Sequence, residues 1–198
     1  VINIDEILKL SFNETKRLAE KFYNDTFLVD QNACSSPHLI LWLGKKNNKA
    51  RTKFWNHLKD CVNRKYNLTD AASMDKYTKL CGQILNSKNI KKYELFGNSI
   101  YTIFLKKLDT NIHNLRGKWG FFYEYNISDL NKIKNYINNK YQTLTYFGLK
   151  KNVLQNFILK NQLNGIDRIV PIGQALDIGF FWDGYDLNKT LSRVVDIK

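Results

Sequence analysis

The side chains best suited to covalent chemistry are three cysteines, Cys34, Cys61 and Cys81. Their number is odd and none has CxxC or Cys/His ligand spacing, so the sequence indicates free thiols, with neither a disulfide framework nor a metal site. Cys34 stands apart because its neighbours are small or polar and Pro37 stiffens the chain after it. Backbone N–H groups at such a turn can stabilise a thiolate and a developing oxyanion. Cys34 is therefore the candidate nucleophile.

The residues around Cys34 leave a second interpretation open, because Ser-Ser-Pro is also typical of a helix start with proline at its first position. No histidine is established as its base. His38 would face the thiol only if the segment were helical, whereas a strand would carry it away. His57 is expected on the polar side of a helix and His113 in a polar loop, as ordinary surface histidines.

Carboxylates and nucleotide motifs add no further site. Asp5 and Glu6 are expected at a helix start, and Asp183 and Asp186 bracket a turn, so no pair of carboxylates is indicated for acid and base catalysis. The chain contains neither GxGxxG nor a Walker-type loop. It therefore carries no nucleotide-binding fingerprint of its own.

Length and composition exclude several protein classes. The 198 residues are 43% hydrophobic, enough for one domain with a real core, which excludes general disorder. No apolar run approaches the roughly 18 residues of a membrane span, so we expect a cytoplasmic protein without one.

The formal net charge of +13 is the second compositional signal. The basic residues occur in short groups such as Lys45-Lys46 and Lys150-Lys151 that flank apolar segments, which is typical of a solvated surface. Nucleic-acid binding is less favoured by this pattern. A nucleotide or coenzyme with several phosphates would suit the same charge.

Hydrophobic periodicity predicts alternating strands and helices. We expect strands at 26–29, 39–43, 100–105, 119–125, 142–147 and 167–170. We expect helices at 12–23, 48–66, from 69 or 70 to about 85, 128–138 and 153–163. This order predicts an α/β domain with a largely parallel sheet, in which the helical spacing places Cys61 and Cys81 in the core.

Three segments resemble one known family. The string DQNACSSPHLILWLG, residues 30–44, looks like the cysteine segment of the LuxC-type fatty acyl-CoA reductases of bacterial bioluminescence, a branch of the aldehyde dehydrogenase superfamily. The string DRIVPIGQALDIGFFWDGYDLNKTLSR, residues 167–193, looks like the C-terminal signature of that family. YQTLTYFGL, residues 141–149, is similar to the corresponding superfamily segment, so the matches span nearly the whole chain.

The resemblance implies a three-layer aldehyde dehydrogenase-like catalytic domain and an NADPH-dependent reductase that forms a fatty aldehyde. Cys34 would take an acyl group from acyl-CoA, or from an acyl carrier or an acyl-protein synthetase, as a thioester. The N–H of Cys34 would form half of the oxyanion hole, and hydride would then displace the thiolate. The resemblance leaves the cofactor-binding residues unknown.

One departure from the family concerns the missing partners of the cysteine. Superfamily members carry a nucleotide-binding domain, an oxyanion-hole Asn and usually a Glu base, whereas only residues 1–33 precede Cys34. We therefore expect residues 1–198 to be the single C-terminal catalytic domain of a longer, homo-oligomeric reductase. Such a domain could be acylated but would not turn over alone.

A second departure concerns the glutamate that holds the cofactor ribose in the superfamily. The ELFG string at 94–97 matches the E-x-F-G-P motif in letters but continues with Asn98. The order of elements instead places Gly117 or Lys118 where that glutamate belongs. Glu94 is therefore expected to be a structural or surface residue.

Two other functions stay open beside the reductase. Cys34 could serve an acyl carrier or thioesterase that releases free acid without a nicotinamide cofactor. Alternatively, the chain could be a basic α/β module that binds nucleic acid with steep salt dependence while Cys34 stays inert.

Overall fold

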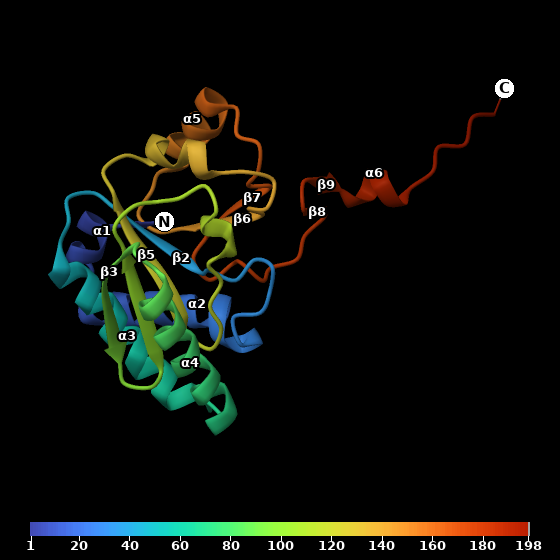
Figure 1. Ribbon diagram of the computed structural model, residues 1–198. Helices are drawn as coiled ribbons and strands as arrows, with labels where there is room; N and C mark the ends of the chain where they lie inside the picture. The colour runs from blue at the N-terminus through green and yellow to red at the C-terminus, as the bar shows by residue number, and fades with distance from the viewer. Residues whose placement is uncertain (198) are drawn as a thin grey trace.

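The computed structural model describes residues 1–197 and is built around a five-stranded mixed sheet (Figure 1). Its strand order is β1-β2-β5-β4-β3. The strands are β1 Ile2–Asn3, β2 Leu39–Leu43, β5 Phe121–Ile127, β4 Ile100–Leu105 and β3 Ile90–Phe96. All neighbours pair in parallel except β3, which runs antiparallel to β4 at one edge. The predicted α/β class with a mostly parallel sheet is thereby confirmed.

Both faces of the sheet are covered, which explains why β2 is a continuous apolar run and why β4 is buried along its whole length. One face carries α1 (Ile4–Lys9), α2 (Phe12–Thr26) and α3 (Asn48–Lys65) (Figure 1). Aromatic side chains interlock there, with the Phe54 and Trp55 rings 5.8 and 6.2 Å from the Trp42 ring. A capping box of Ser11 and Glu14, a pattern that the sequence already contains, begins α2.

The second face is covered by elements that come mostly from the second half of the chain. They are α4 (Asp70–Asn86), η2 (Ile112–Asn114), η3 (Leu130–Tyr136), β6 (Thr143–Tyr146), α5 (Lys151–Asn161) and β7 (Arg168–Pro171). β6 and β7 form a separate two-stranded parallel sheet. A parallel bridge between Ile2 and Phe147 joins this small sheet to the β1 edge of the large one.

A buried ion pair lies in the hydrophobic core between the sheet and the helices α1, α2 and α3. Glu124 on β5 is fully buried and accepts hydrogen bonds from the indole nitrogens of Trp42 and Trp55, at 2.6 and 3.0 Å. Arg51 on α3 donates to both oxygens of Glu124, at 2.6 and 2.5 Å, and to Glu94 at 2.5 Å. The interpretation of Glu94 as a structural residue is consistent with this contact.

The prediction of a strand at 26–29 was wrong. Thr26 ends α2 and residues Phe27–Val29 continue it as the 3-10 helix η1. Phe27 extends the buried helical face of Tyr23, and their rings stack with centroids 5.4 Å apart. A short apolar run does not by itself distinguish a strand from the end of a helix. Cys34 therefore lies between a helix and a strand, and not between two strands.

Two other elements differ from the expectation. The sequence pattern missed β3, an edge strand whose residues alternate between exposed and half-buried. The helix expected at 128–138, for which the sequence favours Ser128 as the N-cap, is a 3-10 helix whose N-cap is Asp129. The Asp129 carboxylate accepts the N–H of Asn131 at 2.9 Å, which sets the helix start one residue later.

The two helical cysteines have different environments. Cys61 is fully buried on α3, as predicted. Cys81 is only partly buried, so its assignment to the core was wrong. The reason is the orientation of α4, which buries Ala72, Lys76 and Leu80 and leaves most of its other apolar side chains at least partly exposed. The large apolar side chains of α4 that are exposed are Met74, Tyr77, Ile84 and Leu85.

Cys61→Ala should lower the free energy of unfolding by roughly 1–2 kcal/mol, because it removes a small buried side chain and leaves a cavity. Urea denaturation followed by circular dichroism measures this loss. Modification of the protein by iodoacetamide should be unchanged, because the buried thiol is not the accessible one. Faster labelling of Cys61 than of Cys34 in the native protein would contradict this assignment.

The first residues after β7 are held against the rest of the protein by hydrogen bonds. Asp25 on α2 accepts the backbone N–H groups of Gly173 and Ala175, at 2.7 and 2.9 Å. Arg168 donates to the carbonyl of Ala175 at 3.1 Å, and its guanidinium lies 4.2 Å from the centroid of the Trp182 ring. These contacts attach the start of the C-terminal segment to the body.

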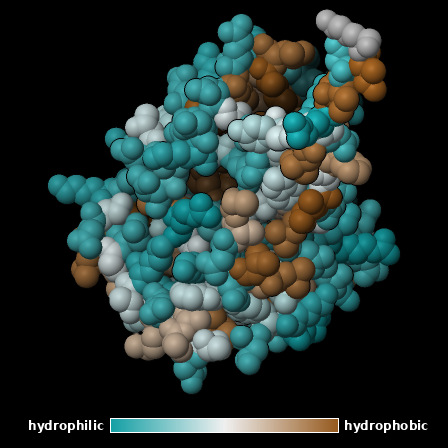
Figure 2. Space-filling model, turned by 90° about the vertical axis from the view of Figure 1, so that its right-hand side faces the viewer, coloured by the Kyte–Doolittle hydropathy of each residue, from teal (hydrophilic) through white to brown (hydrophobic). Residues whose placement is uncertain are grey.

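Beyond these contacts the C-terminal segment leaves the body (Figure 1). It contains the hairpin β8 (Phe181–Trp182) and β9 (Tyr185–Asp186), followed by α6 (Leu187–Leu191). Figure 2 shows hydrophobic residues gathered on the face from which the segment departs. Across residues 1–197, no helix combines the length and the apolar character needed to cross a membrane.

Candidate functional site

Cys34 occupies a tight turn at the amino end of β2. The N–H of Ser36 donates to the carbonyl of Ala33 at 3.0 Å, which places Cys34 and Ser35 at the two central positions. The residues after Pro37 are extended, so the structure supports the predicted turn and shows no helix start here. The Cys34 residue is exposed, whereas Ser35 is buried.

Gln31 holds this turn against the sheet. Its side chain is almost fully buried, and its amide nitrogen donates to the carbonyls of Pro37 and Phe121 at 2.9 and 3.0 Å. Its amide oxygen accepts the N–H groups of Gly120 and Phe121, at 3.1 and 3.2 Å. The side chain therefore connects both ends of the Cys34 turn to the start of β5. The sequence shows Gln31 only as a polar residue near Cys34. Its anchoring role was not predictable, because its partners at the start of β5 lie about 90 residues along the chain.

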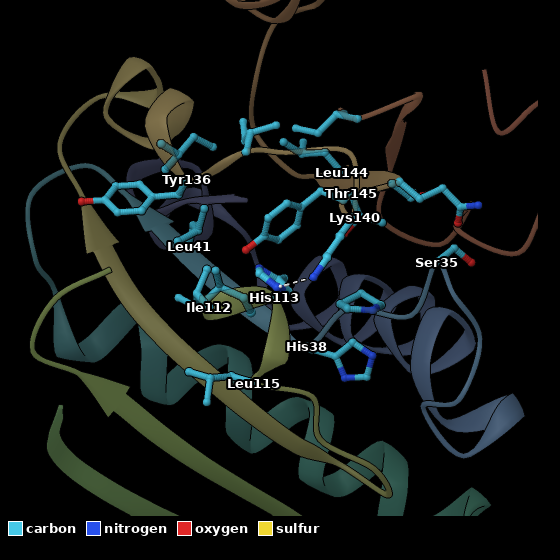
Figure 3. Close-up of a pocket in the computed structure, with 18 of the residues that line it drawn as sticks. Ser35, His38, Leu41, Ile112, His113, Leu115, Tyr136, Lys140, Leu144 and Thr145 are labelled. Atoms are coloured by element: carbon cyan, nitrogen blue, oxygen red, sulfur yellow. Dashed lines mark hydrogen bonds between the residues drawn. The ribbon is translucent and has the colours of Figure 1, made fainter. Parts of the chain in front are cut away.

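One cavity, of about 170 Å³, lies beside Cys34 on the second face of the sheet (Figure 3). Its wall is mostly apolar. Its leucines and isoleucines are Leu39, Leu41, Leu108, Ile112, Leu115, Ile133, Ile137, Leu144 and Ile166. Figure 3 shows Ser35 at one end and Tyr136 at the other. Cys34 is exposed and also contributes to the wall, so this residue borders both the cavity and the solvent.

Buried polar atoms also gather around this cavity. Within the described part of the chain, some of them have no hydrogen-bond partner. They include Ser36 Oγ, His38 Nε2, His113 Nδ1, Tyr141 Oη, Gln142 Oε1 and Thr143 Oγ1. An unpaired buried polar group costs roughly 1–3 kcal/mol, so such a concentration indicates that a ligand or ordered water completes these hydrogen bonds.

His38 lies in the wall of the same cavity as Cys34, although its segment is extended (Figure 3). Its Nδ1 accepts the N–H of Gly117 at 3.2 Å, so in the neutral ring the proton resides on Nε2. Burial, together with the positive charges of Arg116 and Lys79, lowers the pKa of His38 to about 4. The ring is therefore a neutral hydrogen-bond donor at neutral pH and a weak base.

The other histidines lie in different surroundings. His113, expected at the surface, contributes to the cavity wall, and its Nε2 lies 3.0 Å from Lys140 Nζ (Figure 3). That surface assignment was wrong, because η2 folds back over the second face. His57 lies on α3 with its ring 4.9 Å from Phe12, outside the cavity.

The remaining predicted positions are scattered. Glu94 belongs to the ion pair on the first face, and Gly117 contacts the site only through its N–H to His38. Asp183 accepts from Gln142, and Asp186 caps α6, so these two carboxylates do not act as a pair. No group of three or more His, Cys, Asp or Glu in residues 1–197 is arranged to hold a metal ion. No residue of this site is assigned to a nicotinamide cofactor.

The low pKa of His38 predicts acid sensitivity. The folded protein resists protonation of this ring until about pH 4, whereas the unfolded chain binds the proton near pH 6.5, so stability should fall between these values. Each unit of difference between the folded and unfolded pKa values corresponds to about 1.36 kcal/mol, so the free energy of unfolding should fall by about 3 kcal/mol because of this residue. His38→Gln should remove most of that loss.

Urea denaturation of both proteins at pH 7 and pH 4.5 measures this difference. Asp25 titrates in the same range with the opposite sign, because burial raises its pKa to about 6, but it is present in both proteins and cancels in the comparison. An equal loss of stability in the wild type and in His38→Gln would contradict the burial of a neutral His38.

Comparison with models of known protein families and with curated proteins found no match to this chain.

Proposed function

We propose that this chain is the catalytic domain of a fatty acyl-CoA reductase with an aldehyde dehydrogenase-like fold. In this proposal Cys34 is acylated, and NADPH supplies the hydride that releases the acyl group as a fatty aldehyde. The observation that carries the proposal is the exposed residue Cys34 in the wall of an apolar cavity. An apolar wall of this kind suits the alkyl chain of a fatty acyl group.

Two of the segments that carry the family resemblance lie side by side at this cavity. Residues 34–39 come from the cysteine segment, and residues 141–145 come from the superfamily-like segment around β6. They are far apart along the chain but contribute to the same wall. This juxtaposition supports the resemblance, because segments with a shared catalytic role should meet at one site.

The turn also offers groups that could stabilise the reaction's charge. The N–H groups of Cys34 and Ser35 donate no backbone hydrogen bond to the described residues, so both are free to face an acyl oxygen. In the acylation step the Cys34 thiolate attacks the thioester carbonyl, a new C–S bond forms and the donor's C–S bond breaks. The donor leaves as a thiolate and takes up the proton that Cys34 had released to solvent. The developing oxyanion would accept from the Cys34 N–H.

The chemistry is tested by incubation with a long-chain acyl-CoA, followed by intact-mass and peptide mass spectrometry. We expect one acyl group on Cys34. Addition of NADPH to the acylated chain by itself should give no steady production of aldehyde, because we expect the chain to be acylated without turning over alone. Steady aldehyde production by the chain alone would contradict this expectation.

Two results would point to the alternatives. Release of free acid without NADPH would identify a thioesterase instead of a reductase. Absence of acylation, combined with an inert Cys34 and strongly salt-dependent binding to DNA or RNA, would favour the nucleic-acid module.

A further inference from the structure

A crevice lies at the carboxyl ends of the sheet strands, whereas Cys34 lies before the amino end of β2. It forms at the carboxyl ends of β2 and β5, where Leu43 pairs with Ile127 and the N–H of Gly44 donates to the Ile127 carbonyl at 2.9 Å. Its volume is about 790 Å³, which lies in the range typical of small-ligand sites. The crevice and the Cys34 cavity share Leu108 and Tyr136 in their walls.

The topology of the sheet creates this crevice. The chain leaving β2 enters α3 on the first face, whereas the chain leaving the neighbouring strand β5 enters η3 on the second face. Two adjacent parallel strands whose exits diverge in this way leave an opening between their carboxyl ends. Ligands of open α/β sheets bind preferentially at such points.

The crevice is lined by positive charge without any acidic side chain. Lys45 and Lys46 follow β2, and Lys132 and Lys134 belong to η3. None of these four lysines forms an ion pair with a described residue. The nearby Asp129 carboxylate is occupied as the N-cap of η3.

Neutral polar groups also contribute to the wall, beside the apolar and aromatic side chains of Leu108, Tyr125, Ile127 and Tyr136. The side chains of Asn126, Ser128 and Asn135 contribute to it, together with Asn131, whose amide is already bonded to Asp129 and Asn161. Amide and hydroxyl donors beside several ammonium groups suit oxygen-rich anions.

We propose that this crevice binds a small ligand that carries two or more phosphate groups. Four unpaired lysines match the charge of such a ligand, and the concave shape favours a small molecule over an extended polymer. The inference goes beyond the proposed function, because it requires nothing of Cys34 and stands whether or not that thiol is acylated.

The test uses inorganic pyrophosphate as the probe, with isothermal titration calorimetry at low salt. The double variant K45Q/K132Q removes one lysine from each side of the crevice. The matched control K88Q/K91Q removes two exposed lysines elsewhere, so both variants lower the net charge from +13 to +11 (13 − 2). We expect saturable binding to the wild type, roughly tenfold weaker binding to K45Q/K132Q and nearly unchanged binding to the control.

Two outcomes would overturn the proposal. One is the absence of saturable binding to the wild type. The other is equal weakening in both double variants, which would show that the overall charge attracts the anion without a defined site. Binding of pyrophosphate to Cys34→Ala should equal that of the wild type, which separates this inference from the acylation chemistry.

Discussion

Replacement of Cys34 by Ala will abolish acylation by a long-chain acyl-CoA and leave the fold unchanged. Cys34 is exposed at the centre of a turn, so the substitution removes the nucleophile without opening a cavity in the core. We expect the rate of covalent labelling to fall by roughly a hundredfold or more, because no neighbouring group replaces the thiolate. The free energy of unfolding should change by less than about 0.5 kcal/mol.

The matched control is Cys81→Ala, which removes the other thiol that is not fully buried. This variant should be acylated at the wild-type rate, as measured by mass spectrometry under identical conditions. Labelling that persists in Cys34→Ala and disappears in Cys81→Ala would move the nucleophile to α4. It would also separate the reactive thiol from the apolar cavity and remove the main support for the proposed function.

Replacement of Glu124 by Ala will cause the largest loss of stability predicted for this protein, about 3–5 kcal/mol. The carboxylate is fully buried and accepts from Arg51 and from the indoles of Trp42 and Trp55. Its removal leaves a guanidinium and two N–H groups without their acceptor inside the core. Such a loss is a large part of the roughly 5–15 kcal/mol that stabilises a typical domain.

Urea denaturation followed by circular dichroism measures the effect. The control is Glu94→Ala, which removes the second carboxylate bound by Arg51, on a side chain that is 34% exposed. Solvent screening should keep that loss to about 1 kcal/mol or less. If Glu124→Ala does not fold, Glu124→Gln retains an acceptor and should show an intermediate loss. Equal effects at Glu94 and Glu124 would contradict the importance of burial.

Elements with strong local signals were predictable from the sequence. The capping box of Ser11 and Glu14 marks the start of α2, and the apolar run at 39–43 forms β2. The spacing of apolar residues also predicted α3 and the burial of Cys61. Each of these features depends on residues within a few positions of one another, so a linear pattern contains the required information.

Interactions between distant segments were not predictable in this way. The apolar residues of α4 have helical spacing, yet the helix buries Leu80 together with Lys76 and leaves Met74 and Tyr77 exposed. Phe27 continues a helix because its ring packs against Tyr23 and Tyr66. In both cases tertiary packing selects among local conformations that the sequence pattern allows equally.

The candidate site likewise has features that the sequence predicts and features that only the tertiary structure shows. Residue types alone identified Cys34 and its turn, because small and polar neighbours followed by proline have a strong local preference for such a conformation. The tertiary structure decided that Gln31 attaches this turn to β5 and that His38 and His113 lie in one wall with the thiol. It also decided that the lysines after β2 and those of η3 meet in one crevice. These arrangements arise from the parallel pairing of β2 with β5 and from the packing of η3 and β6 over the second face, which bring together residues that are distant along the chain.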